Sequence, residues 1–286
     1  MNIIVKSVFL KSVKVNIKNV KGIDLKKIDV RGAFIKDKII NEKLCFTYIG
    51  GDLIDINLTG VDLKNADMRC SNLEDSNLIF ADLEGADLSK SNLLFTNLRQ
   101  SYLEKALLID TNLKGANLKG TDLENAKLIG ACLEDANLAD ADLTCADLTG
   151  ANLTGANLTG ANLTGANLTD ANLTGASLQY VILRDAVLLG VDLIGADLTC
   201  AKLINTDMRD TNLTGAILTD ANLKNVNFRE ANLTGAKFTR ANLKNINFEL
   251  ADLTGVKFTD TFLDKDYTDY LQKYYNEKAF KNSFWN

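Results

Sequence analysis

The sequence predicts an all-β solenoid, because a five-residue repeat runs through about three quarters of the chain. A large apolar residue recurs at every fifth position from Leu53 to Leu263, which gives 43 centres, of which 37 are Leu. Two residues before each centre stands a small or β-branched residue, most often Ala, as at Ala151. In one helix or one strand, successive centres would point to different sides. The chain must therefore turn once per repeat.

The repeat also predicts the shape of each turn of the solenoid. A short extended segment places the small residue and the centre on one side, and the next two residues, often Thr-Gly, form a corner. If each corner turns through about a right angle, four repeats close a square coil whose Leu and Ala side chains face the axis. Stacked coils then pair as parallel strands about 4.8 Å apart, which gives about 11 coils and a rod of roughly 50 Å.

This run, which is clearest in the ANLTG units of residues 151–164, resembles the pentapeptide repeat family, whose consensus is A(D/N)LXX. The resemblance implies a right-handed quadrilateral β-helix over residues 51–265, and it is not specific for function. The chain contains no Pro, which agrees with coils whose backbone donors are all needed in ladders.

Both ends depart from the repeat. Residues 1–50 are expected to form degenerate coils, with apolar residues at five-residue spacing such as Val5 and Leu10, or else a β cap made of a strand or hairpin. The register shifts by three residues between Ile40 and Leu53, so a loop or widened corner is expected at 41–50.

At the other end, aromatic residues at helical spacing predict a short α-helical cap over residues 266–286. In several members of the family a similar C-terminal element joins two copies, so the resemblance also implies a possible homodimer through this end. The candidate cap or dimer residues are Tyr267, Tyr270, Leu271, Tyr274, Phe284 and Trp285.

The composition argues against catalysis. The chain has no His, which removes Ser-His and Cys-His nucleophiles and the commonest metal ligand. Most Asp residues, such as Asp82 and Asp142, precede a centre, where the family takes Asp or Asn interchangeably, so they are expected to bond the backbone rather than transfer protons. Five irregularly spaced Cys residues predict reduced thiols inside a cell and no zinc site. We expect no enzyme activity, no cofactor and no metal.

The first residues, MNIIVKSVFLKSVKV, lack the uninterrupted apolar core of a signal peptide, and no run of about 18 apolar residues follows. We therefore expect a cytoplasmic protein without a membrane segment.

Outward residues can be sorted onto four faces, because every fourth repeat returns to the same side. We number the faces by their first repeats, which begin at residues 51, 56, 61 and 66, and their net charges are −7, +1, −2 and −4. The acidic first and fourth faces are neighbours, and most apolar corner residues fall on them. A mixed acidic and apolar surface is typical of protein binding. The candidate partner-binding residues are Ile54, Glu74, Asp75, Leu94, Phe95, Ile109, Ile129, Glu134, Asp135, Leu189, Ile194 and Leu250.

Three functions follow from these features. The first is a non-enzymatic, rod-like scaffold that binds a protein partner. The alternative is DNA mimicry, by which quinolone-resistance members of the family bind DNA gyrase, a type II topoisomerase. The two acidic faces carry −11, whereas 50 Å of duplex carries about 30 negative charges. The third, direct nucleic-acid binding by the basic residues 1–50, is disfavoured because few aromatic residues lie between the Lys residues. The sequence favours the scaffold.

Overall fold

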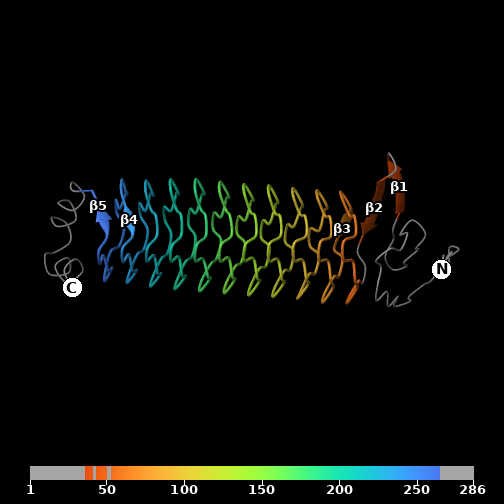
Figure 1. The fold of residues 1–286 in the computed structure, drawn as a ribbon, viewed down its shortest axis with the longest axis horizontal. Helices are drawn as coiled ribbons and strands as arrows, with labels where there is room; N and C mark the ends of the chain where they lie inside the picture. The colour runs from red at the N-terminus through yellow and green to blue at the C-terminus, as the bar shows by residue number, and fades with distance from the viewer. Residues whose placement is uncertain (1–35, 41–42, 50–52, 265–286) are drawn as a thin grey trace.

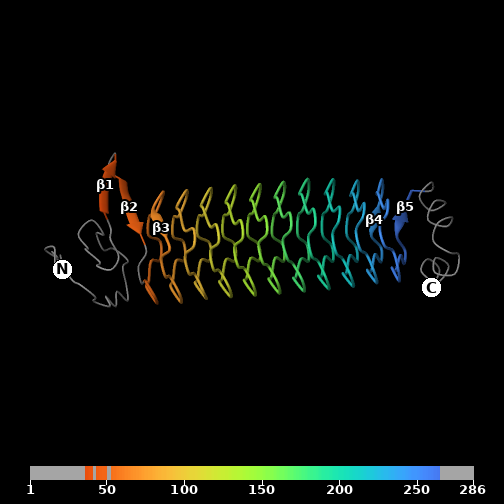
Figure 2. The ribbon, with the colours of Figure 1, turned by 180° about the vertical axis from the view of Figure 1, so that it is seen from behind.

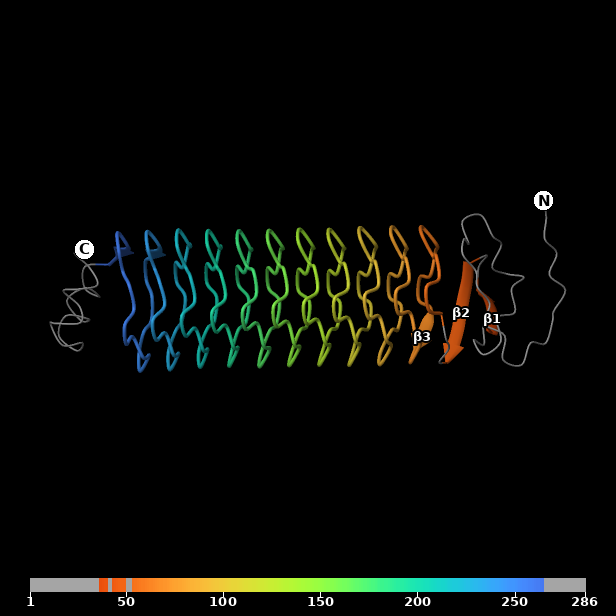
Figure 3. The same cartoon turned by 90° about the horizontal axis from the view of Figure 1, so that it is seen from below.

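The protein is a rod of stacked four-sided coils (Figure 1). The computed structural model describes residues 36–40, 43–49 and 53–264. Seen from below, the coils repeat with a constant shape along the whole rod (Figure 3). The outward surface is therefore a regular lattice on which each residue has a fixed position.

Each corner is a tight turn, and the fifth residue of the repeat, which lies in that turn, has a left-handed backbone conformation. In the turn that ends the repeat of Leu58, the amide of Val61 donates to the carbonyl of Leu58 (3.2 Å), and Gly60 has φ +66°. The fifth residue of every repeat from Asp55 to Asp260 has a positive φ, between +52° and +71°. A positive φ at the third turn position is the signature of type II turns, which explains the abundance of Gly, Asn and Asp there.

Neighbouring coils are joined by parallel hydrogen-bonded ladders. The residue before each centre bridges the residue 20 positions later, as Asn72 does with Asn92. Around this bridge the amide of Leu73 donates to the carbonyl of Asn92 (2.7 Å), and the amide of Asn92 donates to that of Ser71 (2.8 Å). The spacing of 20 residues confirms four repeats per coil. Near the last coil the ladder widens into β4 (Asn242–Leu243) and β5 (Phe262–Leu263), which are parallel.

The axis of the rod is filled by the two residues predicted to face inward. Leu153 is fully buried and Ala151 nearly so, and the other centres from Leu58 to Phe258 are also buried. The four Phe centres form the two columns expected from their ten-residue spacing. Phe228 stacks on Phe248 at 5.6 Å and Phe238 on Phe258 at 5.5 Å, while rings of different columns meet edge to face.

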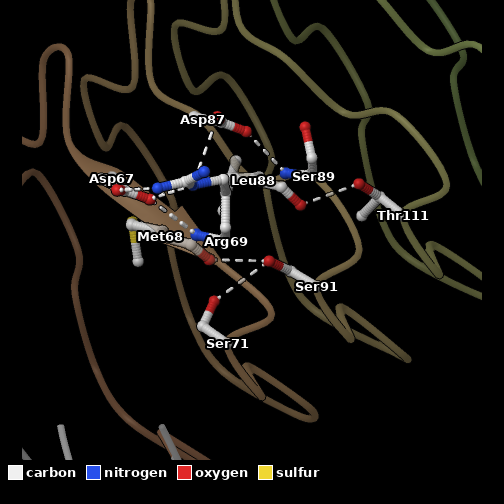
Figure 4. Close-up of polar contacts among 9 residues, drawn as sticks. All are labelled: Asp67, Met68, Arg69, Ser71, Asp87, Leu88, Ser89, Ser91 and Thr111. Carbon is white, nitrogen blue, oxygen red and sulfur yellow. Dashed lines mark hydrogen bonds and ion pairs between the residues drawn. The ribbon is translucent and has the colours of Figure 1, made fainter. Parts of the chain in front are cut away.

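Ser and Thr replace Ala at several inward positions without leaving a polar atom unpaired. The hydroxyl of Ser91 donates to the carbonyl of Met68 (2.8 Å), and that of Thr111 donates to the carbonyl of Leu88 (2.9 Å), both on the preceding coil (Figure 4). A buried hydroxyl that lacks such a partner would be costly. These bonds add a second link between coils beside the backbone ladder.

At the N-terminal end a hairpin replaces the coil. Strands β1 (Lys36–Ile40) and β2 (Lys43–Ile49) are antiparallel, and β2 pairs in parallel with β3 (Asp67–Arg69) (Figure 2). Thr47 lies opposite Asp67, which is again a separation of 20 residues, so β2 already follows the register of the coils. The loop or widened corner expected at 41–50 is not found at residues 43–49, which form strand β2. The hairpin covers the edge that the first coil would otherwise expose.

The rest of both ends lies outside the described residues. This applies to residues 1–35, for which degenerate coils were expected, and to the predicted α-helical cap at 266–286 with all its candidate residues. Within the part of the chain that the structure describes, every element is a strand, a bridge or a turn.

Candidate protein-binding surface

Two positions of each repeat supply most of the outer surface: the residue before the centre and the residue after it. The two are coupled, because the carboxylate of Asp142 accepts the amide of Thr144 (2.9 Å) and the side-chain oxygen of Asn152 accepts that of Thr154 (3.1 Å). This confirms that Asp and Asn serve the same structural role before the centre. The side chain of the residue after the centre lies on the same face as that of the residue before it, as shown by the ion pair of Arg209 with Asp207 (2.7 Å).

The first face brings seven of the predicted residues together in its first five coils. The amide of Asp55 donates to the carbonyl of Glu74 (2.9 Å), and the amide of Asp75 donates to that of Leu94 (3.0 Å). The same ladder continues through Lys114 to Glu134. This stretch, which we call the N-terminal patch, consists of Ile54, Glu74, Asp75, Leu94, Phe95, Glu134 and Asp135.

The patch stays negative even though one of its carboxylates is paired. Lys114 Nζ lies 2.7 Å from Glu134, and this hydrogen bond raises the pKa of the Lys114 ammonium above its ordinary value. The carboxylate of Glu74 accepts a neutral donor, the side-chain amide of Asn92 (3.2 Å). The described residues form no ion pair with Glu74, Asp75 or Asp135. Three carboxylates are thus available to a partner.

Phe95 is the most unusual residue of the patch. Its side chain is 57% exposed although its backbone is left-handed, with φ +54°. A bulky residue in this conformation costs about 1 kcal/mol, and an exposed ring recovers little of that by burial. Phe80, Tyr180 and Leu250 share the same combination elsewhere on the rod. The left-handed φ belongs to the corner of every repeat, so these four residues are set apart by an exposed apolar side chain at a position where Gly, Asn and Asp are usual.

The remaining predicted residues do not join the patch. Ile109 and Ile129 lie on consecutive coils of the fourth face, where the amide of Asp110 donates to the carbonyl of Ile129 (2.9 Å), and both side chains are half-buried. Leu189, half-buried, and Ile194, exposed, lie beyond the neutral ANLTG units. Leu250 is exposed near the other end, about 45 Å from Ile54 at the spacing of parallel strands. The predicted surface is therefore divided into the N-terminal patch and three separate groups.

The structure also exposes apolar residues that the sequence analysis missed. Tyr102, Val187 and Phe262 occupy the position before a centre, where Asn or Asp is usual, and all three are exposed. The sequence analysis looked for apolar residues at the corner positions. A search of the position before each centre would have found these three residues as well. Val187 extends the group of Leu189 and Ile194, whereas Tyr102 lies on the third face.

Comparison with known proteins establishes the family. The family profile described as pentapeptide repeats matches eight copies, over residues 56–93, 91–130, 131–170, 171–210, 206–245 and 231–265. The chain belongs to the pentapeptide repeat family. Members of this family fold as right-handed β-helices, in agreement with the all-β coils described above. No curated protein sequence matches the chain.

Among solved structures, this pentapeptide repeat protein is similar to HetL of the cyanobacterium Nostoc sp. strain PCC 7120, which is involved in the regulation of heterocyst differentiation. The two are 33% identical over 74% of this chain and 86% of HetL, with a TM-score of 0.56. QnrB1, a plasmid-mediated fluoroquinolone resistance protein, is 20% identical over 77% of this chain and 95% of its own, with a TM-score of 0.37. A pentapeptide repeat protein of the Arabidopsis thaliana thylakoid lumen is 34% identical over 40% of this chain and 76% of its own, with a TM-score of 0.30.

No catalytic family is indicated by these comparisons. Within residues 53–264 no group of three or more Cys, Asp or Glu side chains is arranged to hold a metal ion. Cys70 and Cys145 are exposed, Cys132 and Cys200 are half-buried, and all four are free thiols. In the described part of the chain no helix is long and apolar enough to cross a membrane.

Proposed function

We propose that this pentapeptide repeat protein is a non-enzymatic scaffold that binds a protein partner through the N-terminal patch. The single observation that carries the proposal is Phe95, an exposed aromatic residue at a left-handed corner, beside the carboxylates of Glu74 and Asp75, which form no ion pair with another described residue. Aromatic side chains surrounded by a polar rim supply most of the energy of protein interfaces. A partner with an apolar pocket bordered by basic residues would match this surface.

The experiment compares Phe95→Asn with Phe80→Asn. Both Phe residues occupy the left-handed corner position, with φ +54° and +57°, and their side chains are 57% and 50% exposed. Phe80 lies on the second face, outside the patch. Since Asn tolerates a positive φ, both variants should fold at least as stably as the wild type.

The readout is capture of cellular proteins by the immobilised protein, followed by titration of the purified partner. Phe95→Asn should weaken binding about 30-fold or more, as expected when an interface anchor is removed, whereas Phe80→Asn should bind as the wild type does. Equal binding by all three proteins would contradict the assignment of the patch. A loss of binding in Phe80→Asn alone would assign the site to the second face instead.

DNA mimicry remains the alternative. The net charge of −11 on the first and fourth faces is about a third of the charge on a duplex of the same length, and Lys114 neutralises part of it. Supercoiling by a bacterial gyrase, with this protein titrated to about 10 μM, would detect micromolar affinity. If this protein inhibits supercoiling, and the inhibition is lost when Glu74, Asp75, Glu134 and Asp135 are neutralised, DNA mimicry would replace the scaffold as the proposed function.

Two further expectations accompany the scaffold. The odd number of irregularly spaced Cys residues supports a place in the cytoplasm, where thiols stay reduced. A homodimer through the aromatic C-terminal end would present two patches to the same partner. Fractionation of cells would test the cytoplasmic location, and cross-linking at Trp285 would test the homodimer.

A further inference from the structure

The charges of the third face are segregated along the rod. Its repeats from 61–65 to 141–145 carry a net charge of −5, whereas those from 181–185 to 241–245 carry +3. The repeat between them, residues 161–165, is uncharged and has only short side chains. The small net charge of the whole face therefore hides an acidic half and a basic half of opposite sign.

The basic half contains one carboxylate, that of Asp185, which accepts the side-chain amide of Asn205 (2.8 Å) and forms no ion pair with a described residue. Arg184, Lys202, Lys224 and Lys244 are all exposed, and none forms an ion pair with another described residue. Cations at these positions do form such pairs where a carboxylate is near, as Lys64 does with Asp82 (3.2 Å) and Glu84 (2.7 Å). Four unpaired cations on successive coils repel one another, and an acidic partner would relieve that repulsion.

The acidic half is only partly neutralised. Lys64 pairs with Asp82 and Glu84, and Lys105 with Glu104. On the next coil, Asp122 accepts the amide of Glu124 (3.0 Å), and Glu124 accepts the side-chain amide of Asn125 (3.1 Å), which are neutral donors. Tyr102 is 53% exposed in the same region. This half offers carboxylates and one aromatic ring to a basic partner.

A second copy of the chain fits this pattern. The face has eleven repeats, from 61–65 to 261–265, and the uncharged repeat 161–165 is the sixth. Consider a two-fold axis that passes through that repeat, lies in the plane of the face and is perpendicular to the rod. It makes the two copies antiparallel, and each position within a repeat then lies opposite the same position in a repeat of the other copy. The axis then places Asp122 opposite Lys202, Glu104 opposite Lys224 and Glu84 opposite Lys244. A parallel arrangement would place like charges together.

The size and shape of the face suit such a dimer. Eleven coils extend about 50 Å and four extended residues about 13 Å, so contact would bury on the order of 650 Å² per copy, or about 1,300 Å² in total. That total lies within the range of stable interfaces. Asn162 and Thr164 are half-buried and Gly165 has no side chain, so the centre of the face allows close approach.

We propose that two copies of this protein associate as an antiparallel dimer through their third faces, with the two-fold axis at residues 161–165. The dimer is held by reciprocal charge pairs, each present twice by symmetry, and by burial of Tyr102. Because the third face lies opposite the first, the dimer leaves both N-terminal patches outward. It is therefore compatible with the proposed scaffold without depending on it, and it is an alternative to a homodimer through the C-terminal end.

Charge reversal tests the pairing. Sedimentation equilibrium of the full chain in about 50 mM salt should show a dimer that dissociates as salt increases, because added ions screen the pairs. Asp122→Lys and Lys202→Glu should each raise the dimer dissociation constant at least tenfold, and the double variant should recover the affinity of the wild type. Asp147→Lys, a change at the same repeat position on the fourth face, is the control and should remain a dimer.

Cysteine cross-linking tests the geometry independently of these variants. In a background with the five native Cys residues changed to Ser, Thr164→Cys should form a disulfide-linked dimer on mild oxidation, since residue 164 faces its own copy. Thr154→Cys is the matched control: it lies on the same coil and repeat position of the first face, and Thr154, like Thr164, donates its hydroxyl to the preceding Asn. It should stay monomeric on the gel.

Four results would overturn the proposal. The first is a monomer at about 100 μM protein in low salt, a concentration that detects weak association. The second is a dimer that survives both single charge reversals. The third is equal cross-linking at residues 154 and 164, which would indicate random collision. A dimer that cross-links only through the C-terminal end would assign dimerisation to that end instead. None of these outcomes depends on the function of the N-terminal patch, which the Phe95 variants test.

Discussion

The ring of Phe95 lies directly over Gly115 of the next coil. A β-carbon at residue 115 would lie 2.5 Å from Cδ1 of Phe95, a distance that side chains do not tolerate. Gly115 also has a φ of +63°. The glycine thus meets two requirements at once: it forms the corner of its own coil, and it leaves room for the exposed ring of the coil before it.

Gly115→Ala should destabilise the protein by more than a corner substitution alone. Gly175 provides the comparison, because it occupies the same corner of the first face with φ +67° and has nothing within 4 Å of a β-carbon. Gly175→Ala should cost about 1 kcal/mol through backbone strain, and Gly115→Ala should cost that amount plus the displacement of the ring. Urea unfolding measures both, and equal costs would show that the ring moves aside freely.

Leu153→Asp should lower the free energy of unfolding by at least about 4 kcal/mol, because the side chain is fully buried in a dry axis and an unpaired carboxylate there is costly. The neighbouring change Asn152→Asp is the control. Its position accepts either residue, and the side-chain oxygen of Asn152 already accepts the amide of Thr154. Thermal unfolding of both variants would decide the point: normal stability of Leu153→Asp would refute the inward orientation.

Phe238→Ala should destabilise the C-terminal coils by about 3–5 kcal/mol, the usual cost of deleting a buried ring. Phe238 is fully buried, stacks on Phe258 and meets the edges of Phe228 and Phe248. Phe238→Leu should cost less, since Leu fills the equivalent position in most other coils. Hydrogen exchange on the variant would locate the loss, which should be largest in the coils around residue 238.

The pair of Asp220 with Arg240 predicts a pH dependence. Arg240 donates to both carboxylate oxygens (2.7 and 2.5 Å), and this hydrogen bonding holds the pKa of Asp220 below its ordinary value. A carboxyl whose pKa is lower when folded stabilises the protein above the unfolded pKa of about 3.9, and this contribution is lost as the pH falls through the folded pKa. Carboxyl NMR titration should show the low pKa in the wild type.

Arg240→Gln provides the control for this titration. Removing the guanidinium should return the pKa of Asp220 toward that of an ordinary Asp, and should reduce the loss of stability that occurs as the pH falls below the unfolded pKa of about 3.9. An unchanged titration of Asp220 in this variant would mean that another group, and not Arg240, sets its pKa.

The sequence by itself determined the coil. A period of five with one large apolar centre permits a single arrangement in which both apolar positions face the same side, and the 20-residue ladder from Asn57 to Lys257 follows from it. The inward placement of Leu153 and the two Phe columns were predictable for the same reason. The β-helix and the family followed from the repeat alone, because local turn geometry repeats without long-range choices.

Only the tertiary structure decided how the surface is divided. The exposure of a side chain depends on which side chain of the next coil lies beside it. Phe95, whose ring lies over Gly115, is therefore exposed, whereas Leu94 is half-buried. Charge likewise depends on neighbours 20 residues away: Lys114 pairs with Glu134, whereas Lys202 forms no ion pair with a described residue. The sequence left degenerate coils and a hairpin as alternatives for residues 1–50, and only the antiparallel pairing of β1 with β2 decides for the hairpin at these two strands.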